Sequence, residues 1–528
     1  MDDEESVDGE EASVEPLSAR LVSDAVVYPT IRVASRPGQL LMGVYDGDGA
    51  YVDGTVLDRR SGEQGAPVPR DLYAPVTGPA EPEAIYAGPL YYHFGHFLLE
   101  SLARTWYAQR HPEVPLVWAG QHSWQGFTMA PWQSEILELL GLTNPTRILV
   151  DPTRFDLLHV PDIGYRYDDR FHPEHAAFLG RYQGPDQVPG SRLWLSRTKI
   201  DSEVRDLNGG ATERWLTKEG WRIIHPEGVS VREQLDALGA AENVAGEEGS
   251  AFHAIVLLAD VAAKKFHVLR RHGAEHRNMH TVGDARHVDQ TFSSVERQVV
   301  LQAQGRVVSK ISPSSADVLE VLGVPVHEAA VPEWADPIIS RVLDDLGPQR
   351  LLDVGATSSQ PVVRSAAPVR VAVSRRLDVD PRVLAPAGVE VYELGLEEYA
   401  DLFHGKQEPF DVIRIAGNKL DEVMESFRAS TGLADESTVW VLGCGRFAAR
   451  VALAVRLLHP GYTVLRVLVQ RKIVFVVRRA ADEPSDVRAV KQLSAAEVSR
   501  RLRWVRPVRL QRLREATTGS RPADPPTS

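Results

Sequence analysis

The spacing of apolar positions along the chain changes repeatedly between the two-residue period of strands and the three- to four-residue period of helices. Residues 21–85 alternate short apolar runs with Gly, Asp and Pro, which predicts β-hairpins and turns. Residues 91–110 carry apolar side chains at helical spacing, and 114–118, 131–140 and 147–150 follow as strand, helix and strand. This alternation of short strands and helices predicts a layered α/β domain.

Two further groups of strands and helices follow. Residues 183–190 are rich in Pro and Gly and predict a linker, after which strands at 193–195 and 221–224 alternate with helices up to a glycine-containing loop at 246–250. Two such groups predict two Rossmann-like halves that face one cleft, with ligands at the carboxyl ends of the strands. A third group begins near residue 337. Its predicted strands are 351–355, 369–373, 389–392, 410–415, 438–442 and 464–477.

The length of 528 residues exceeds what one hydrophobic core usually serves, which agrees with several domains. The hydrophobic content of 43% and the charged content of 25% are typical of folded globular proteins. The expected segments are a disordered acidic leader at 1–20, a first half at 21–182, a second half at 190–335, a third Rossmann-type domain at 340–480, and a basic, partly disordered tail at 481–528.

Cysteine usage and hydropathy predict a cytoplasmic protein. The single cysteine, Cys444, excludes an intramolecular disulfide and any zinc cluster built from cysteines. No apolar run reaches the length of about 18 residues that predicts a transmembrane helix, and the first residues lack the basic and apolar regions of a secretory signal. We therefore expect any membrane association to be peripheral.

The net charge of −13 argues against general binding of nucleic acid, because most of the surface would repel the phosphate backbone. Residues 2–15 carry eight acids and no base, which predicts a solvated leader. The tail is basic instead, and it could contact an anionic membrane surface or form a solvated Arg-rich helix, which Pro507 would interrupt. Its arginines include Arg500, Arg501, Arg503, Arg506, Arg509, Arg512 and Arg514.

The first candidate for chemistry is a charged face on the helix predicted at 91–110. If this helix begins near Gly95, then His96, Glu100 and Arg104 follow one another at four-residue spacing and share one face. A carboxylate one turn from an imidazole can fix its tautomer and raise its basicity, as a general base requires. The alternative is a histidine at a helix N-terminus beside an ordinary Glu–Arg surface pair.

Two further candidates follow strands of the second half. Arg197 and Lys199 come directly after the strand at 193–195, and Arg205 follows, so these cations could bind a diphosphate or lie in a solvated loop. The loop with Gly249 and Ser250 precedes a helix, whose N-terminal N–H groups and dipole favour an anion. Two glutamates in this loop oppose an anion unless one of them contacts sugar hydroxyls.

Taken in order, these pieces make the chain from about residue 91 to 269 resemble glycosyltransferase family 61, a group of inverting transferases that includes bacterial capsule-type enzymes. The motifs are His-Phe-Gly-His-Phe-Leu-Leu-Glu-Ser-Leu-Ala-Arg at 93–104, Leu-Ser-Arg at 195–197, Arg-Asp-Leu-Asn at 205–208, Gly-Trp-Arg-Ile-Ile-His-Pro-Glu at 220–227, Ser-Val-Arg-Glu-Gln at 230–234 and Gly-Ser-Ala-Phe-His at 249–253. The resemblance implies a GT-B pair of Rossmann halves, a nucleotide-sugar donor held mainly by the second half, a glycan or polysaccharide acceptor, and no required cofactor or active-site metal.

The resemblance also assigns roles to residues. His96 matches the family's helix histidine and would be the catalytic base, with Glu100 as its acidic partner. The residues expected to bind the donor are Arg104, Arg197, Lys199, Arg205, Gln234, Glu248, Gly249, Ser250 and His253. The chain departs from the family pattern at His93, where Asn is common, at Phe97, where Trp is frequent, and at His253-Ala254, where an Asn often occurs.

Residues 349–480 resemble a class I methyltransferase Rossmann domain. The motifs are Arg-Leu-Leu-Asp-Val-Gly at 350–355 and Phe-Asp-Val-Ile-Arg-Ile-Ala-Gly at 410–417. Ser374 follows the second strand where an acid would bind ribose, and Ala416 replaces an Asp, so we expect a degenerate S-adenosylmethionine site that Asp378 or Asp380 could partly restore. The alternatives to a transferase alone are a bifunctional glycosyltransferase and methyltransferase, or a non-catalytic scaffold in polysaccharide assembly. The histidines His272, His276, His280 and His287 lack paired acids and predict no metal site.

Overall fold

A computed structural model describes the chain between residues 15 and 479. Within this span the description leaves out residues 33–38, 61–63, 121–127, 201–208, 271–276, 296–297, 304–305, 312–314, 326–338, 340–341, 344–345, 356–361, 364, 377–381, 383–387, 418, 459–460 and 470–471. The chain divides into two compact units, residues 1–199 with 220–294 and residues 200–219 with 295–528.

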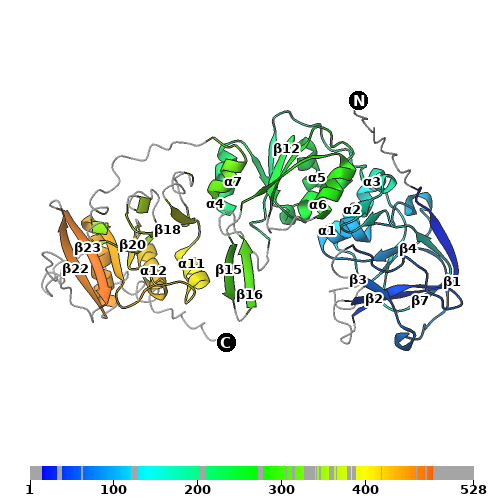
Figure 1. Ribbon diagram of the computed structural model, residues 1–528, viewed down its shortest axis with the longest axis horizontal. Helices are drawn as coiled ribbons and strands as arrows, with labels where there is room; N and C mark the ends of the chain where they lie inside the picture. Colours follow the sequence, from blue (N-terminus) through cyan, green and yellow to red (C-terminus); the bar gives the residue numbers. More distant parts are fainter. Residues whose placement is uncertain are drawn as a thin grey trace, which may run out of the picture. The chain divides into compact units, whose positions relative to one another are not determined.

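The first unit contains a mixed seven-stranded sheet in the order β3-β2-β1-β7-β4-β5-β6. Its strands are β1 (Ala19–Arg32), β2 (Gln39–Tyr45), β3 (Gln64–Pro67), β4 (Glu81–Pro89), β5 (Leu116–Ala119), β6 (Thr146–Leu149) and β7 (Thr153–Pro161). Strand β1 runs antiparallel to β2 and β7, as the expected hairpins suggest, while β7, β4, β5 and β6 are parallel. Figure 1 shows this sheet around the labels β1, β2, β3, β4 and β7.

The second sheet of this unit is parallel and has the order β11-β10-β12-β13-β14. Its strands are β10 (Arg192–Leu195), β11 (Arg222–Ile224), β12 (Asn243–Glu247), β13 (Lys265–Arg270) and β14 (Asp289–Ser294). The chain leaves β10 for one side of the sheet and then returns to build the other side from β12. The neighbouring carboxyl ends of β10 and β12 therefore form a topological switch point, the place where open α/β sheets bind ligands.

Helices join the two sheets through one continuous apolar core. This core includes Trp118 in the first sheet, Val244 in the second, and Phe97, Leu235 and Ile255 from helical segments. The helical segments are α1 (Phe94–His96), the π-helical turn η2 (Phe97–Ser101), η3 (Ala108–Arg110), α2 (Pro131–Leu139), α3 (Pro173–Leu179), α5 (Val231–Ala240), the 3-10 helix η5 (Ser250–Leu257) and α6 (Arg277–Arg286). This shared core holds α1 and η5 against each other.

The second unit contains another seven-stranded sheet, in the order β19-β18-β17-β20-β21-β23-β22. Its strands are β17 (Arg350–Val354), β18 (Val369–Val373), β19 (Val389–Tyr392), β20 (Val412–Ile415), β21 (Val439–Cys444), β22 (Tyr462–Val469) and β23 (Lys472–Arg479). The first five are parallel in the order 3-2-1-4-5 of doubly wound sheets, and β23 is antiparallel to both of its neighbours. The strand predicted at 464–477 is thus a hairpin of two strands.

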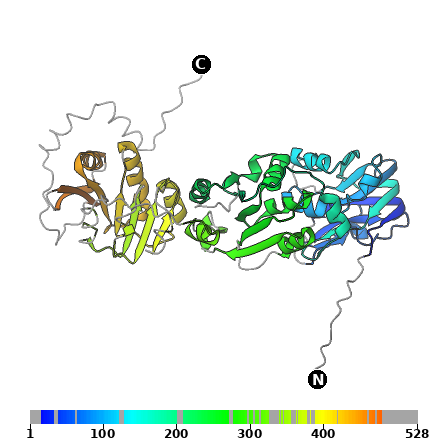
Figure 2. The same cartoon turned by 90° about the horizontal axis from the view of Figure 1, so that it is seen from above.

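Helices and a hairpin complete this unit. They are α4 (Gly209–Lys218), β15 (Gln298–Ala303), β16 (Arg306–Ile311), α7 (Ser315–Val321), α11 (Leu396–Phe403), α12 (Leu420–Ser430), η7 (Thr431–Leu433) and α13 (Gly445–Leu458). A hydrogen bond of 3.0 Å between the Thr212 and Ser315 hydroxyls ties α4 to α7. Figure 2 shows the helices beside the strands of each unit. The mixed α/β class with parallel-rich sheets is confirmed.

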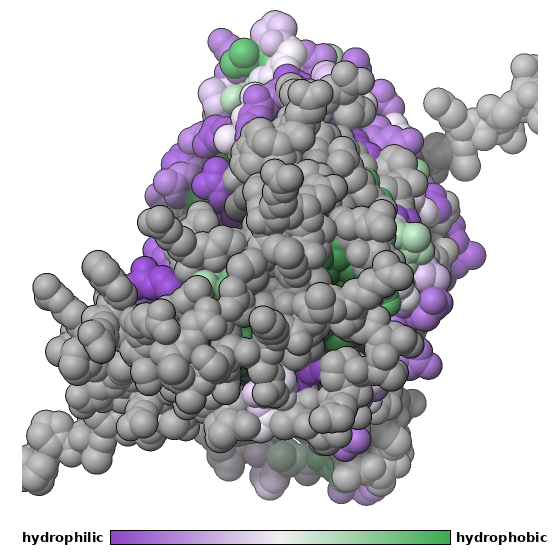
Figure 3. Space-filling model, turned by 90° about the vertical axis from the view of Figure 1, so that its left-hand side faces the viewer, coloured by the Kyte–Doolittle hydropathy of each residue, from purple (hydrophilic) through white to green (hydrophobic). Residues whose placement is uncertain are grey.

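Two observations concern the surface and the membrane. Among the described residues, no helix combines the length and the apolar character needed to cross a bilayer. The coloured atoms in Figure 3 are mostly hydrophilic, and hydrophobic ones are visible there only in small separate patches. Scattered apolar residues of this kind are normal on folded proteins.

Candidate functional site

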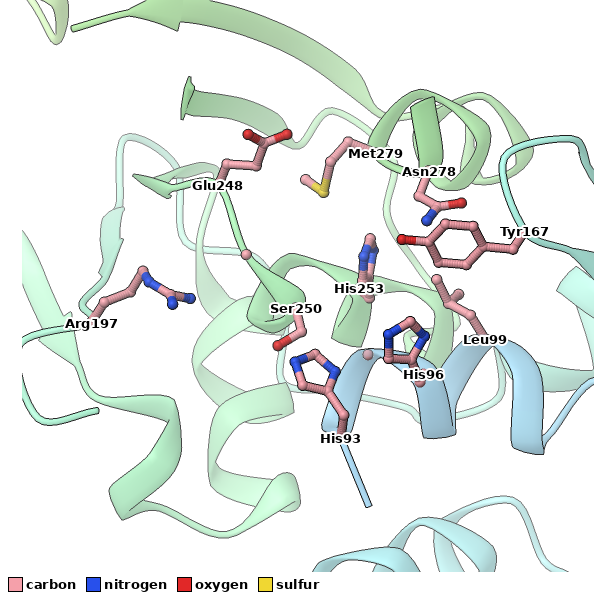
Figure 4. A pocket seen from close by; sticks show the side chains of 12 residues that line it. His93, His96, Leu99, Tyr167, Arg197, Glu248, Ser250, His253, Asn278 and Met279 are labelled. Carbon is pink, nitrogen blue, oxygen red and sulfur yellow. The ribbon is translucent and has the colours of Figure 1, made fainter. Parts of the chain in front are cut away.

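The predicted chemistry converges on a cavity of about 240 Å³ in the first unit. It lies where α1 meets η5, beside the loops that follow β10 and β12. Its lining residues are His93, Gly95, His96, Leu99, Tyr167, Arg197, Glu248, Gly249, Ser250, His253, Asn278 and Met279. Figure 4 shows Arg197 on one side of the cavity and Tyr167 with Asn278 on the other. The cavity therefore has a cationic end and an end with uncharged polar groups.

Close approach of α1 to η5 shapes the middle of this cavity and depends on Gly95. A Cβ atom added to Gly95 would lie 2.8 Å from the Ser250 Cβ and 3.2 Å from the His253 Cδ2. Carbon atoms in contact prefer about 3.5–4.0 Å, so only glycine allows this approach. Gly95 thus brings the helix with His96 against the loop with Ser250.

His96 is hydrogen-bonded to a buried carboxylate. Its Nδ1 lies 2.6 Å from Glu100 Oε2, and the side chains of His96 and Glu100 are 29% and 5% exposed. The π-helical turn η2 joins the two residues, and π-turns occur often at functional sites. When Nδ1 donates its proton to Glu100, the lone pair is on Nε2, which is the arrangement of a neutral general base.

A second partner of Glu100 comes from a loop outside the predicted site. Arg59 binds the carboxylate through two hydrogen bonds, from Nε to Oε1 at 2.7 Å and from Nη2 to Oε2 at 2.8 Å. Burial by itself raises the pKa of the Glu100 carboxyl, but the hydrogen bonds from His96 and Arg59 outweigh it and leave the pKa below its ordinary value. Glu100 is therefore an ionised carboxylate inside the protein.

The cationic end of the cavity is built at the switch point between β10 and β12. Arg197 follows β10, and its guanidinium lies so close to Gly249 that a Cβ there would collide with it. Gly249 caps η5, whose first N–H groups can bind an anion together with Arg197. Gln234 on α5 supports the loop from behind, because its Nε2 donates to the Ala251 carbonyl at 3.1 Å.

The opposite end of the cavity is organised by Asn278 on α6. Its Oδ1 accepts hydrogen bonds from the Tyr165 hydroxyl and from the Asp168 N–H, the latter at 2.9 Å. Tyr167 lies between these two residues, and its ring is stacked on His96 with centroids 5.6 Å apart. Burial is the main reason that the pKa of the Tyr167 hydroxyl is raised, so this hydroxyl stays protonated at neutral pH. His93 completes the site with its pKa lowered by burial, by His96 and by Arg197.

The structure brings most of the predicted site residues to this cavity. Those that line it are His96, Arg197, Glu248, Gly249, Ser250 and His253. Glu100 lies behind His96, and Gln234 is buried behind the loop. Lys199 is exposed and does not line the cavity, and Arg205 lies outside the described residues.

The expectation that Arg104 shares a face with His96 and Glu100 is wrong. The π-helical turn and the irregular turns after it break the regular helical spacing. The Arg104 guanidinium is buried instead, where it donates to the carbonyls of Pro161 and Gly54 and lies over the Tyr86 ring. Arg104 therefore ties the helical segment to the first sheet and does not reach the cavity.

Sequence reasoning missed Arg59, Tyr167, Asn278 and Met279. No motif surrounds these residues, and their distance along the chain from His96 hides the contact. The sequence did single out His93, because the resembled family commonly has Asn at this position. His272 and His276 lie outside the described residues, and within the described part of the chain no three His, Cys, Asp or Glu side chains gather as metal ligands.

A comparison with known protein families finds a match in the part of the chain that builds the candidate site. The family model Glycosyltransferase 61 matches residues 94–264, which include α1, both strands that flank the switch point, and η5. This part of the chain is therefore similar to a glycosyltransferase. No curated protein matches the chain.

Solved structures of methyltransferases show a limited likeness. One is the O-methyltransferase from Bacillus cereus in complex with SAH, with 16% identity and a TM-score of 0.22 over 30% of this chain and 86% of that chain. Another is the T. thermophilus 16S rRNA N2 G1207 methyltransferase RsmC, with 13% identity and a TM-score of 0.23 over 56% of this chain and 90% of that chain. TM-scores of this size support no functional inference.

Proposed function

We propose that the chain is an inverting glycosyltransferase that moves a sugar from a nucleotide-sugar donor to a glycan or polysaccharide acceptor. The observation that carries this proposal is the cavity in which a carboxylate-bound histidine faces the arginine and glycine loop of a switch point. The match of residues 94–264 to a glycosyltransferase family supports it. We propose a GT-B pairing of the two α/β halves of the first unit on the same grounds.

In this proposal His96 is the general base. Its Nε2 takes the proton of an acceptor hydroxyl, while the hydroxyl oxygen forms a bond to the anomeric carbon of the donor. The bond from that carbon to the diphosphate breaks with its electron pair on the diphosphate oxygen, so the configuration inverts. Glu100 stabilises the imidazolium that His96 becomes, because its carboxylate accepts the Nδ1 proton at 2.6 Å.

Arg197 and the first turn of η5 would bind the leaving diphosphate. A guanidinium can donate two parallel hydrogen bonds to a phosphate, and the backbone N–H groups beside Gly249 and Ser250 can add others. Glu248 lines the same cavity and would accept hydrogen bonds from sugar hydroxyls. We propose that the reaction needs no metal ion, because the cationic groups of the site neutralise the diphosphate.

For the second unit we propose a methyltransferase-like Rossmann fold that serves packing or docking of a partner. The strand order 3-2-1-4-5 and the turn at Gly355 support the fold. A Cβ on Gly355 would collide with the Ala416 carbonyl, so the turn lies against the end of β20. A bifunctional enzyme is the second candidate, and it requires that this unit bind S-adenosylmethionine. We also propose a cytoplasmic location with peripheral membrane contact through the tail, which lies outside the described residues.

Calorimetric titration of the full chain with a panel of nucleoside diphosphates tests the proposal. We expect one nucleotide to bind, and we expect Arg197→Ala to weaken that binding by about 10-fold or more, since a charge-assisted hydrogen bond contributes about 1.5–3 kcal/mol. Arg222→Ala is the matched control, because Arg222 is exposed at the amino end of β11. Failure of every nucleotide to bind would contradict the transferase and favour the scaffold. Binding of S-adenosylmethionine would favour the bifunctional enzyme.

A further inference from the structure

Arg59 reaches the candidate site from a loop that lies outside the region matched by the glycosyltransferase family. Its backbone forms a β-bridge with Tyr167, and the next residue, Arg60, donates its N–H to the Tyr167 carbonyl at 3.1 Å. The Arg59 guanidinium lies over the rings of Tyr167 and Tyr91, at 5.0 and 5.6 Å from their centroids. Backbone pairing and two aromatic rings therefore define the position of this guanidinium.

The contact between Arg59 and Glu100 orients the carboxylate group that contacts His96. Arg59 donates to both oxygens, at 2.7 Å to Oε1 and 2.8 Å to Oε2, so the carboxylate plane is aligned with the guanidinium plane. Oε2 therefore contacts both Arg59 Nη2 and His96 Nδ1, the latter at 2.6 Å, while Oε1 accepts from Arg59 Nε. A rotation of the carboxylate that would break its contact with His96 would also break the paired hydrogen bonds to Arg59.

Arg59 also changes the charge that His96 experiences. The side chains of Arg59 and Glu100 are 9% and 5% exposed, so little water screens them. A buried carboxylate with only an imidazole beside it would favour the doubly protonated imidazolium, which cannot act as a base. The positive charge of Arg59 balances the negative charge of Glu100, so this buried pair is neutral overall. The Arg59 Nη2 lies 3.4 Å from His96 Nδ1. Other titratable groups near His96 include His93, Tyr91 and Tyr167, whose rings pack against it, and His253 on η5, which lines the same cavity.

We propose that Arg59 is a positioning residue for the base of the transfer reaction, acting through Glu100 to keep His96 neutral with its proton on Nδ1 and its lone pair on Nε2. The effect on catalysis rests on the proposed function, but the tautomer of His96 can be measured without turnover. Arg59 is not among the residues that line the cavity.

Stability alone is a poor explanation for this contact. Buried ion pairs are often no more stabilising than apolar residues of similar volume, because removing both charges from water is costly. The pair includes the Glu100 carboxylate, which contacts the candidate base, so its orientation has a chemical consequence. A structural role and a positioning role also predict different results for the conservative variant Arg59→Lys, which keeps the charge but cannot form the paired hydrogen bonds.

Nitrogen-15 NMR of the full chain, labelled at its histidine rings, tests the tautomer. The variant His96→Gln identifies the His96 signals by their loss. We expect the wild-type His96 to carry a proton on Nδ1 and none on Nε2 at neutral pH. We expect Arg59→Gln to give a doubly protonated ring or a mixture of tautomers, and Arg59→Lys to give a mixture. Arg60→Gln is the matched control, since Arg60 is exposed and adjacent, and it should match the wild type.

A His96 ring that keeps the wild-type pattern in both Arg59 variants would overturn the inference. Thermal unfolding of each variant is measured alongside. If Arg59→Gln does not fold, the Arg59→Lys spectrum decides, because a wild-type pattern in that variant contradicts a role for the paired hydrogen bonds.

Kinetics then connect the tautomer to catalysis. With the sugar nucleotide that the wild type turns over, we expect Arg59→Gln to lower kcat by about 100-fold, the lower end of what a general base contributes, with KM changed less than about 3-fold. In the Glu100→Gln background the same change should lower kcat by less than about 2-fold, since Arg59 acts through Glu100. Equal losses in both backgrounds would contradict the inference. Absence of turnover in the wild type would contradict the proposed function and leave the NMR result to decide the role of Arg59.

Discussion

Replacing Gly95 with alanine should separate the two sides of the candidate site. Gly95 lies in α1, one residue before His96, and its α-carbon faces η5. The added Cβ would lie 2.8 Å from the Ser250 Cβ. That atom is attached directly to the backbone and cannot swing away as the end of a long side chain can. The clash can be relieved only if α1 and η5 move apart.

The size of the effect follows from this distance. Carbon contacts below about 3.5 Å are repulsive, so the two segments must separate by about 0.7 Å. Overpacking of this kind typically costs about 1–3 kcal/mol, offset by up to about 1 kcal/mol because alanine favours a helix. Misplacement of reacting groups by about 1 Å can cost about 100-fold in rate. We expect Gly95→Ala to lower kcat by about 10- to 100-fold and the Tm by a few degrees.

Gly228→Ala is the matched control for this experiment. Nothing lies within 4 Å of a Cβ added to Gly228, and its backbone is not in the left-handed region. The assays are thermal unfolding of the full chain and release of the nucleoside diphosphate from the sugar nucleotide. A Gly95→Ala variant with the Tm and kcat of the control would refute the claim that contact between α1 and η5 shapes the site.

Three other substitutions test separate parts of the account. Gly249→Ala should weaken nucleoside diphosphate binding by about 10-fold in calorimetry, because the new Cβ displaces the Arg197 guanidinium, and unchanged affinity would contradict this. Burial lowers the pKa of His175 from 6.5 to about 3, so between these values the unfolded chain binds an additional proton. The wild type should therefore lose up to about 1.4 kcal/mol of stability per pH unit as the pH falls below about 6.5, and His175→Phe should reduce this loss in urea unfolding. Equal pH slopes would contradict this. Asp353→Ala leaves Arg414, its partner at 2.6 Å, without that carboxylate and should destabilise the second unit by about 3 kcal/mol, whereas a change below about 1 kcal/mol would count against it.

The fold was predictable where local patterns and topology agree. The strands on both sides of the switch point were visible as short apolar runs followed by Arg197 or by the loop with Gly249. Because carboxyl ends of parallel strands meet at one edge, residues about 50 positions apart could be expected to converge. The structure places both of them at the cavity.

The rest of the site depended on contacts that leave no local pattern. The π-helical turn η2 has the same apolar spacing as an α-helix, so Arg104 was assigned to the wrong face. Arg59 precedes Glu100 by 41 positions and lies in a segment without a period, so its role follows only from tertiary structure. Asn278 lines the cavity and accepts a hydrogen bond from Tyr165, which is 113 positions away in the sequence. The periodicity of apolar residues along the chain does not predict contacts between residues so far apart in the sequence.

Turnover of sugar nucleotides by the wild type and by His96→Gln tests the central claim most directly. The full chain is incubated with a panel of sugar nucleotides, and the released nucleoside diphosphate is measured with and without a mixture of glycan acceptors. The account predicts release from one donor by the wild type, stimulated by acceptor, and a loss of about 100-fold or more in His96→Gln. Release by His96→Gln at the wild-type rate would contradict the assignment of the base. No release from any donor would contradict the glycosyltransferase itself.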